Sequence, residues 1–204
     1  MTNITILGET SLACTLGEKY RSRGMQVTYG VSGTFQADSI AWRILLQQGN
    51  VVDYEEAISG SDVVLVCCDN EQLPEICQVL KAVNGNKLVI DCTNATSEQE
   101  DKICNTEYIQ KHAKVKRIFK AFNNLGIDYP NCDKLQMLKE TYYCGNDDED
   151  CKLVRKLAEI IGYRAIFAGK IQNAYLLEAM YHLSKQIKNS VSTNSDYFFK
   201  IMSV

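Results

Sequence analysis

The sequence predicts a doubly wound α/β fold, with a mostly parallel sheet and a small helical portion at the C-terminus. Three observations predict this class. Short β-branched or apolar runs alternate with segments of helical spacing along most of the chain. Residues 62–68 and 87–93 are built on continuous apolar runs, as is typical of strands covered on both faces of a parallel sheet. A glycine turn, residues 8–13, joins the first predicted strand to the first predicted helix.

The predicted strands are short and rich in valine, isoleucine, tyrosine and phenylalanine, which favour extended backbone. Most are separated by helical segments, so right-handed crossovers should lay them parallel. In order, they are residues 3–7, 26–31, 62–68, 87–93, 115–123, 140–147 and 163–169.

The predicted helices carry apolar residues at intervals of three and four. In the first, Leu12, Leu16 and Tyr20 share one face, and Gly24 is expected to end it. The fourth has acids in its first turn, where they favour the helix dipole, and Gly162 follows its end. The predicted helices are residues 11–24, 35–49, 71–83, 148–162 and 170–192.

The last predicted helix has an apolar stripe formed by Leu176, Met180, Leu183, Ile187 and Val191. Any such helix buries one face, so the stripe could pack within the chain or form a dimer seam. We expect residues 1–170 to form the α/β domain and residues 171–204 to form a helical segment packed on it.

Composition and charge narrow the function classes. The net charge of −3 gives no basic footprint for nucleic acid and no basic patch for an acidic membrane. No apolar run approaches the ~20 residues of a spanning helix, and the N-terminus shows no secretion signal. We therefore expect a cytoplasmic protein whose partners are neither nucleic acid nor membrane.

Cysteine and histidine give no sign of a metal site. The nine cysteines are not spaced as zinc ligands, and we expect them to be reduced thiols that act as small core residues. Cys67 and Cys68, at the end of a predicted strand, could instead form a redox pair. His112 and His182 each stand alone in a helical stretch and are expected to be surface or packing residues.

The turn at residues 8–13 follows the dinucleotide fingerprint G-x-G-x-x-G/A with one departure. Gly8 would make the tight turn, and Ala13 is small enough for the helix to approach the sheet. Thr10 stands where glycine usually lets the backbone reach a diphosphate, so its branched side chain should crowd that group. Its hydroxyl could compensate by donating a hydrogen bond, and the helix N-terminus still offers N–H groups.

The residues at the end of the second predicted strand do not indicate whether the cofactor is NAD or NADP. An acid there would hold the ribose of NAD, whereas an arginine would pair with the 2′-phosphate of NADP. Residues 29–34 (YGVSGT) contain neither. Ser32 and Thr34 could bond a phosphate or a hydroxyl, and the segment could equally be a plain turn.

Taken in order, short motifs over nearly all of the chain resemble one family. It is the deazaflavin-dependent NADP reductases (8-hydroxy-5-deazaflavin:NADPH oxidoreductases), a group that includes the cytosolic reductase domain of membrane ferric reductases. The resemblance implies a Rossmann-type domain with a small C-terminal helical portion, and homodimers. The motifs are ILGETSLA at 6–13, DCTN at 91–94, KAFN at 120–123, GNDDE at 145–149, AGKIQNAYLLE at 168–178 and FKI at 199–201.

The resemblance also implies a set of nucleotide-binding positions. The turn would meet the diphosphate, residues 31 and 32 would meet the 2′-phosphate, and the others would surround the nicotinamide. These positions are Gly8, Glu9, Thr10, Ser11, Leu12, Ala13, Val31, Ser32, Cys68, Asp69, Asn94, Phe122 and Asn123. The cofactor would be NADP or NAD, and only the resemblance favours NADP. Three departures stand out: Thr10 replaces a glycine, Asp69 replaces a proline, and the phosphate-binding arginine is missing.

Two functions follow from these observations. The first is an NAD(P)-dependent oxidoreductase that transfers hydride to or from a flavin-like, deazaflavin-like or other small redox acceptor. Such transfer between stacked rings needs no nucleophile, so no catalytic side chain is named. Asp91 and Asn94 are expected to line the site, since ligands bind at the carboxyl ends of the strands. The alternative is a Rossmann-type binding or regulatory protein that has lost catalysis.

Overall fold

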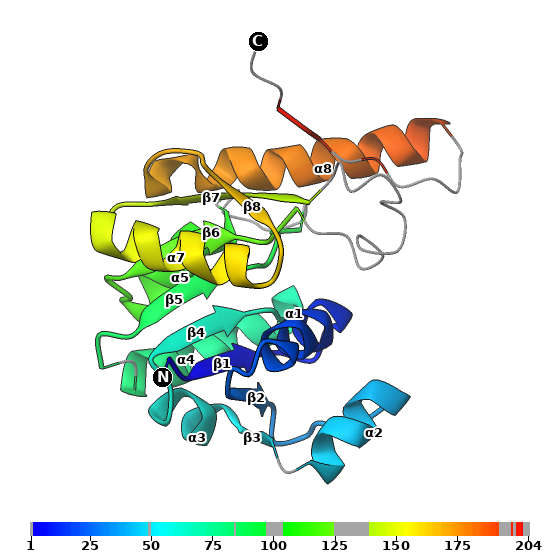
Figure 1. Ribbon diagram of the computed structural model, residues 1–204, viewed down its shortest axis with the longest axis vertical. Helices are drawn as coiled ribbons and strands as arrows, with labels where there is room; N and C mark the ends of the chain where they lie inside the picture. The colour runs from blue at the N-terminus through cyan, green and yellow to red at the C-terminus, as the bar shows by residue number, and fades with distance from the viewer. Residues whose placement is uncertain are drawn as a thin grey trace.

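A single sheet runs through the centre of the molecule, with helices on both faces (Figure 1). The computed structural model describes residues 2–48, 50–83, 85–96, 104–124, 139–191, 197 and 199–201. Within these residues the sheet has eight strands in the order β3-β2-β1-β4-β5-β6-β7-β8. Every pair is parallel except β6 with β7. The predicted doubly wound, mostly parallel α/β fold is confirmed.

The strands are β1 (Ile4–Leu7), β2 (Val27–Val31), β3 (Val51–Asp53), β4 (Val63–Val66), β5 (Leu88–Asp91), β6 (Ile118–Ala121), β7 (Glu140–Gly145) and β8 (Arg164–Phe167). The helices are α1 (Ser11–Ser22), α2 (Ile40–Gln47), α3 (Tyr54–Ser59), α4 (Leu73–Val83), α5 (Asn105–Ala113), α7 (Asp148–Ile160) and α8 (Ala174–Val191). Two short 3-10 turns, η1 (Asn70–Gln72) and η2 (Ile171–Asn173), precede α4 and α8.

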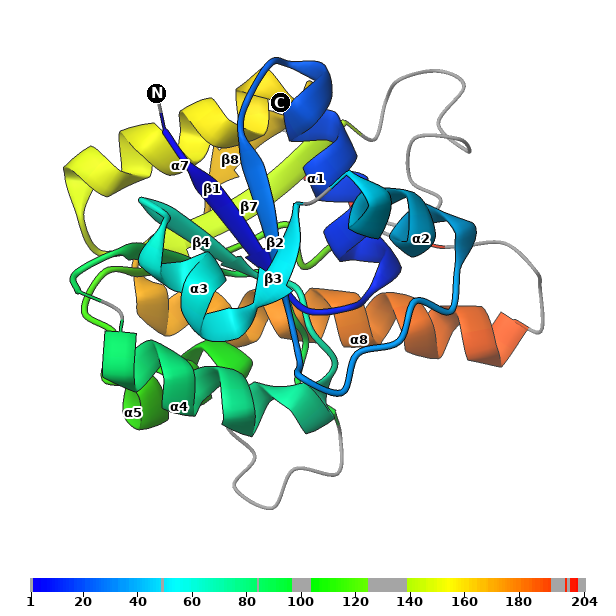
Figure 2. The ribbon, with the colours of Figure 1, turned by 90° about the horizontal axis from the view of Figure 1, so that it is seen from below.

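The central strands have no polar alternation because both of their faces are buried. In β4, Val63 and Leu65 pack with α1 and α7, whereas Val64 and Val66 pack with α3, α4, α5 and α8. Figure 2 shows these two helical layers on opposite sides of the sheet. Among the described residues, no helix combines the length and the apolar character needed to cross a bilayer.

The strand order reverses between β1 and β4. From β1 the chain continues outward through β2 to β3, and from β4 it continues the other way through β5. In open α/β sheets, the crevice beyond the carboxyl ends of two such strands is where ligands bind. The topology therefore locates the candidate site before any side chain is considered.

Some elements differ from the sequence predictions. The second helix begins at Ile40 rather than at residue 35, because the Ser39 hydroxyl caps it by accepting from the Trp42 N–H at 3.3 Å. Strand β3, helix α3 and helix α5 were not predicted. The stripe predicted on α8 is largely exposed at Leu183 and at Val191, so most of it does not pack within the described chain.

Candidate functional site

A cavity of about 640 Å³ opens at the carboxyl ends of the central strands. It lies at the β1/β4 reversal, and its volume is in the range of small-molecule sites. Its walls come from five parts of the chain. They are residues 10–12 after β1, residues 67–70 after β4, residues 92–96 after β5, Asn123 after β6, and Tyr181 with His182 on α8.

Gly8 makes the tight turn that leads into this cavity. Its φ is +116°, and a Cβ at this position would lie 2.5 Å from the Cys67 carbonyl oxygen. Its N–H donates to the Gly30 carbonyl at 3.0 Å, which ties the turn to β2. Only glycine satisfies this backbone angle and this close approach of β4 together.

The Thr10 side chain points into the protein and not toward a ligand. Its hydroxyl donates to the Cys67 carbonyl at 2.6 Å and accepts from the Ala13 N–H at 3.3 Å, which makes Thr10 the N-cap of α1. The expectation that this hydroxyl donates to a phosphate is therefore wrong, because its hydrogen is already used. Thr10 links α1 to the end of β4 and still borders the cavity.

The first backbone N–H groups of α1 are left without a hydrogen-bond acceptor among the described residues. Among the described residues, no hydrogen bond uses the N–H of Ser11 or Leu12. Both residues line the cavity. Unpaired N–H groups at a helix N-terminus, together with the helix dipole, favour a negatively charged ligand group.

The end of β4 carries two buried thiols and one acid. Burial raises the pKa of both Cys67 and Cys68 well above 9.0, so neither is a thiolate at neutral pH. Both thiols are buried, as the core interpretation predicts, and their raised pKa values do not favour the redox-pair alternative. Burial also raises the pKa of Asp69, with smaller contributions from Glu71 and Glu9.

A buried ionic cluster lies beneath the cavity floor. The Lys120 ammonium donates to Asp91 Oδ2 at 2.7 Å, to the Thr93 carbonyl at 2.6 Å and to Glu178 Oε1 at 2.5 Å. All three charged side chains are at most 4% exposed. The expectation that Asp91 lines the site is wrong, because Asp91 is consumed in this cluster.

The cluster fixes the segment that follows β5. Asp91 Oδ1 accepts from the N–H and the hydroxyl of Thr93, at 2.9 and 2.7 Å. Glu178 on α8 accepts from the backbone N–H groups of Ala95 and Asn105, both at 3.0 Å. The cavity wall at residues 92–96 is thereby held between β5, β6 and α8.

Three asparagines connect this wall to its neighbours. The Asn94 amide donates to the Asn123 carbonyl at 3.0 Å, and the Asn123 amide donates to Asn94 Oδ1 at 2.9 Å. The Asn70 amide donates to the Asn94 carbonyl at 3.0 Å. The Asn123 amide also donates to the Leu177 carbonyl at 2.9 Å, and its own Oδ1 is buried without a hydrogen-bond partner among the described residues.

The nucleotide-binding positions that the resemblance implied fall into three groups in the structure: residues that line the cavity, residues of the core, and residues beside the cavity. Those that line the cavity are Thr10, Ser11, Leu12, Cys68, Asp69, Asn94 and Asn123. Gly8 shapes the turn from behind. Ala13, Val31 and Phe122 are core residues, and Phe122 turns the chain at φ 62°. Glu9 and Ser32 lie to one side of the cavity and are joined by a hydrogen bond of 3.1 Å.

The contribution of α8 to the cavity wall was not predicted from the sequence. Tyr181 and His182 line the cavity, so His182 is neither a plain surface residue nor a core residue. Their helical spacing gives no signal for this position, because it depends on how α8 crosses the sheet. His112, by contrast, stacks on Tyr108 with ring centroids 4.2 Å apart, as expected for a packing residue.

The comparisons with known proteins agree with the resemblance. Residues 3–95 match the model of the family described as NADP oxidoreductase, coenzyme F420-dependent. The metalloreductase STEAP3 of Rattus norvegicus is 22% identical over 179 residues, which cover 87% of this chain and 36% of that protein. The chain thus spans about a third of the length of that relative.

Solved structures share the fold at low sequence identity. A proposed F420-dependent NADP reductase from Arthrobacter sp. FB24 has a TM-score of 0.84 and 17% identity, with all of both chains covered. An imine reductase from Streptomyces aurantiacus has a TM-score of 0.67 and 15% identity, over 92% of this chain and 62% of that one. The predicted family resemblance is confirmed in sequence over residues 3–95, and the solved structures show that the fold is shared over nearly all of the chain.

Proposed function

We propose that this chain is an NAD(P)-dependent oxidoreductase. Its residues 3–95 match the model of the coenzyme F420-dependent NADP oxidoreductase family. The chain would transfer hydride between a nicotinamide nucleotide and a flavin-like, deazaflavin-like or other small redox acceptor. One observation carries the proposal. The cavity lies at the β1/β4 reversal, against the Gly8 turn and the N-terminus of α1, and most of its lining residues belong to the segment that matches the family.

The residues around the turn fit the diphosphate of a dinucleotide. Gly8 brings the backbone close to the end of β4 where any Cβ would collide. The unshared N–H groups of Ser11 and Leu12 supply donors where the α1 dipole favours negative charge. The Thr10 hydroxyl is not available to the diphosphate, because it donates to the Cys67 carbonyl and so ties the turn to the end of β4.

Asn123 is suited to bind the nicotinamide end of the nucleotide. Its amide nitrogen donates to Asn94 Oδ1 and to the Leu177 carbonyl, which fixes the orientation of the side chain. The remaining Oδ1 is a buried acceptor without a partner among the described residues, and such an atom is costly unless a ligand donates to it. The carboxamide N–H of a nicotinamide is a donor of the required kind.

The chemistry needs little from the side chains. A bound nicotinamide nucleotide supplies or receives the hydride, and the acceptor ring or centre completes the exchange. The chain orients the reactants and limits water in the cavity. Cys67 and Cys68 take no part, since burial raises the pKa of both thiols.

Binding and turnover test the proposal separately. Calorimetric titration with NADH and NADPH measures binding, and loss of absorbance at the nicotinamide band measures turnover with FMN, a 5-deazaflavin or a ferric chelate. We expect at least one nucleotide to bind and at least one acceptor to be reduced. Asn123→Ala should weaken nucleotide binding about tenfold, whereas Asn189→Ala on the exposed face of α8 should not. No binding of either nucleotide at millimolar concentration would refute the proposal.

The second candidate is a nucleotide-binding or regulatory protein without turnover. The cavity lining favours it in one respect, because it contains Asp69 and neither lysine nor arginine. A nucleotide that binds saturably, while no acceptor of the three classes is reduced, would support this candidate over the enzyme.

We also propose that the protein is cytoplasmic and that it forms a homodimer through α8. Leu183 and Val191 are 51% and 52% exposed, so the stripe leaves apolar surface uncovered. The eight cysteines of the described residues are all free thiols, which is consistent with a reducing compartment. Light scattering should give a dimer mass for the wild type and a monomer mass for Leu183→Glu; an unchanged mass would contradict the seam.

A further inference from the structure

We propose that Glu9 makes this site selective for NAD(H) over NADP(H). Its carboxylate would accept from the adenosine ribose hydroxyls, replacing the acid that the end of β2 lacks. This inference rests on the proposed function, because it assigns the nucleotide to the same site.

The position of the carboxylate carries the inference. Glu9 Oε1 accepts from the backbone N–H of Ser32 at 3.1 Å, and Ser32 is the first residue after β2. In NAD-binding folds of this topology, the ribose-binding acid lies at the end of the second strand. Here an acid reaches the same end of β2 from the glycine turn instead.

The backbone that carries Glu9 is anchored. The Trp42 indole N–H donates to the Glu9 carbonyl at 3.0 Å, and Trp42 is only 2% exposed. The Trp42 ring packs edge-on against Tyr29 and Phe35, with centroids 5.6 and 5.0 Å away. The packed aromatic cluster therefore anchors the backbone of Glu9, and the Ser32 N–H holds its carboxylate at the end of β2.

The second carboxylate oxygen is available to a ligand. Among the described residues, no hydrogen bond uses Glu9 Oε2. A carboxylate only accepts, so a ribose hydroxyl can donate to it whereas a phosphate cannot. The atom is thus suited to the 2′-hydroxyl of NAD(H).

A 2′-phosphate would meet opposing features at the same place. It would bring close to two negative charges beside the Glu9 carboxylate. The Ser32 N–H already donates to Glu9, and the Ser32 hydroxyl is 3.2 Å from that of Thr34. Val31 and Ser32 replace the serine and arginine that the resemblance places there, so no cation compensates at those positions.

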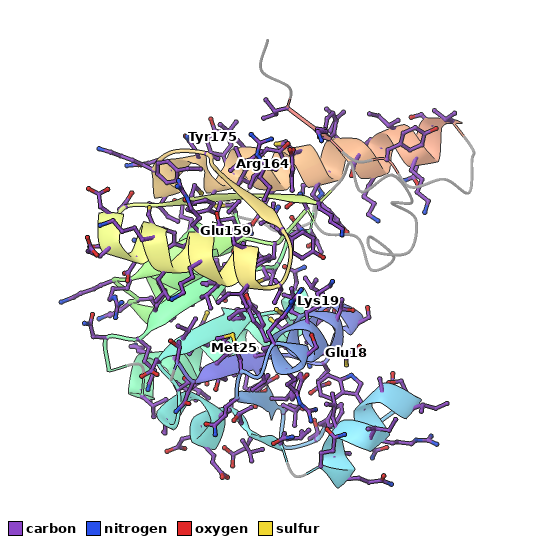
Figure 3. All side chains as sticks on the ribbon, viewed as in Figure 1. Glu18, Lys19, Met25, Glu159, Arg164 and Tyr175 are labelled. Carbon is purple, nitrogen blue, oxygen red and sulfur yellow. The ribbon has the colours of Figure 1, made fainter. Side chains whose placement is uncertain are left out.

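Dissociation constants for NADH and NADPH, measured by calorimetry on the full chain, test the inference. The wild type should bind NADH about tenfold or more tightly than NADPH, the range of a lost charge-assisted hydrogen bond. Glu9→Gln should bring the two constants within about threefold. Glu9→Gln combined with Ser32→Arg should favour NADPH. The control is Glu159→Gln on α7, which Figure 3 shows on that helix. Helix α7 contacts β7 and β8, at the end of the sheet away from β2, so this variant should keep the wild-type ratio.

The outcomes separate the two proposals. If both nucleotides bind and NADPH binds as tightly as NADH, or if Glu9→Gln leaves the ratio unchanged, the role of Glu9 is refuted and the oxidoreductase proposal stands. If neither nucleotide binds the wild type, both proposals fail. Circular dichroism and thermal unfolding of Glu9→Gln, which keeps the side-chain shape, separate a lost contact from a lost fold.

Discussion

Replacement of Lys120 by methionine perturbs the cluster on which the cavity floor depends. Methionine replaces the apolar stem of the side chain but removes the ammonium group, with its charge and three donated hydrogen bonds. Asp91 and Glu178 would then lie side by side in the core, each at most 4% exposed, without the cation between them.

The loss should be large. Removing one partner of a buried ion pair costs about 3–5 kcal/mol, because the remaining charge is left uncompensated. For a chain of 204 residues this corresponds to a fall in Tm of roughly 6–20 °C. Lys152→Met is the matched control, since Lys152 and Glu149 form an exposed pair on α7 and its loss should not move Tm measurably.

The pH dependence of the stabilisation by Lys120 gives a second test of the cluster. Burial lowers the pKa of Lys120, but Asp91 and Glu178 outweigh burial, so the pKa lies above its ordinary value of 10.5. The stabilisation by Lys120 is therefore complete below that pH and is lost only as the pH rises through the folded-state value. Because Lys120 stays charged throughout this range in the wild type, the cost of Lys120→Met should be present at both pH 7 and pH 9.

Urea unfolding of both variants, followed by circular dichroism at pH 7 and 9, measures these costs. A loss below about 1 kcal/mol at pH 7, or a loss that disappears by pH 9, would refute the role assigned to the cluster.

Three further predictions concern the turn and the thiols. Gly8→Ala should destabilise by about 2 kcal/mol or more in urea unfolding, since its Cβ would meet the Cys67 carbonyl at 2.5 Å and its φ is +116°; an unchanged midpoint would contradict this. Thr10→Val should cost about 1–3 kcal/mol in the same measurement, because it removes the helix cap and the bond to Cys67. Thr10→Ser keeps both bonds and should match the wild type. Cys67 and Cys68, which are buried and whose pKa values burial raises, should react with a disulfide reagent at pH 8 far more slowly than the same thiols in the unfolded chain. Rapid native-state labelling of either thiol, located by mass spectrometry, would count against that assignment.

The fold was predictable because its strongest signals are local. Continuous apolar runs identified β4 and β5, and the glycine turn identified the β1–α1 junction. The elements that were missed have weak local patterns. Strand β3 has three residues, and α5 buries the polar residues Asn105 and Thr106 besides Ile109. The antiparallel pairing of β7 with β6 leaves no trace in either strand alone.

The candidate site was less predictable because its key contacts join distant residues. Lys120 and Glu178 are 58 positions apart, and Glu9 meets Ser32 across 23 positions. Residue type and spacing placed Thr10 correctly in the turn but could not show that its hydroxyl points to Cys67. Which polar groups face the cavity and which are used within the core depends on tertiary packing.

The proposed function requires the N-terminus of α1 to receive the diphosphate of a nicotinamide nucleotide. Backbone amide chemical shifts during an NADH titration test this contact most directly, residue by residue. We expect saturable shifts at Ser11 and Leu12, with further shifts at residues 67–70 and 92–95. Saturable shifts confined to other parts of the chain, with the Ser11 and Leu12 amides unmoved, would contradict it.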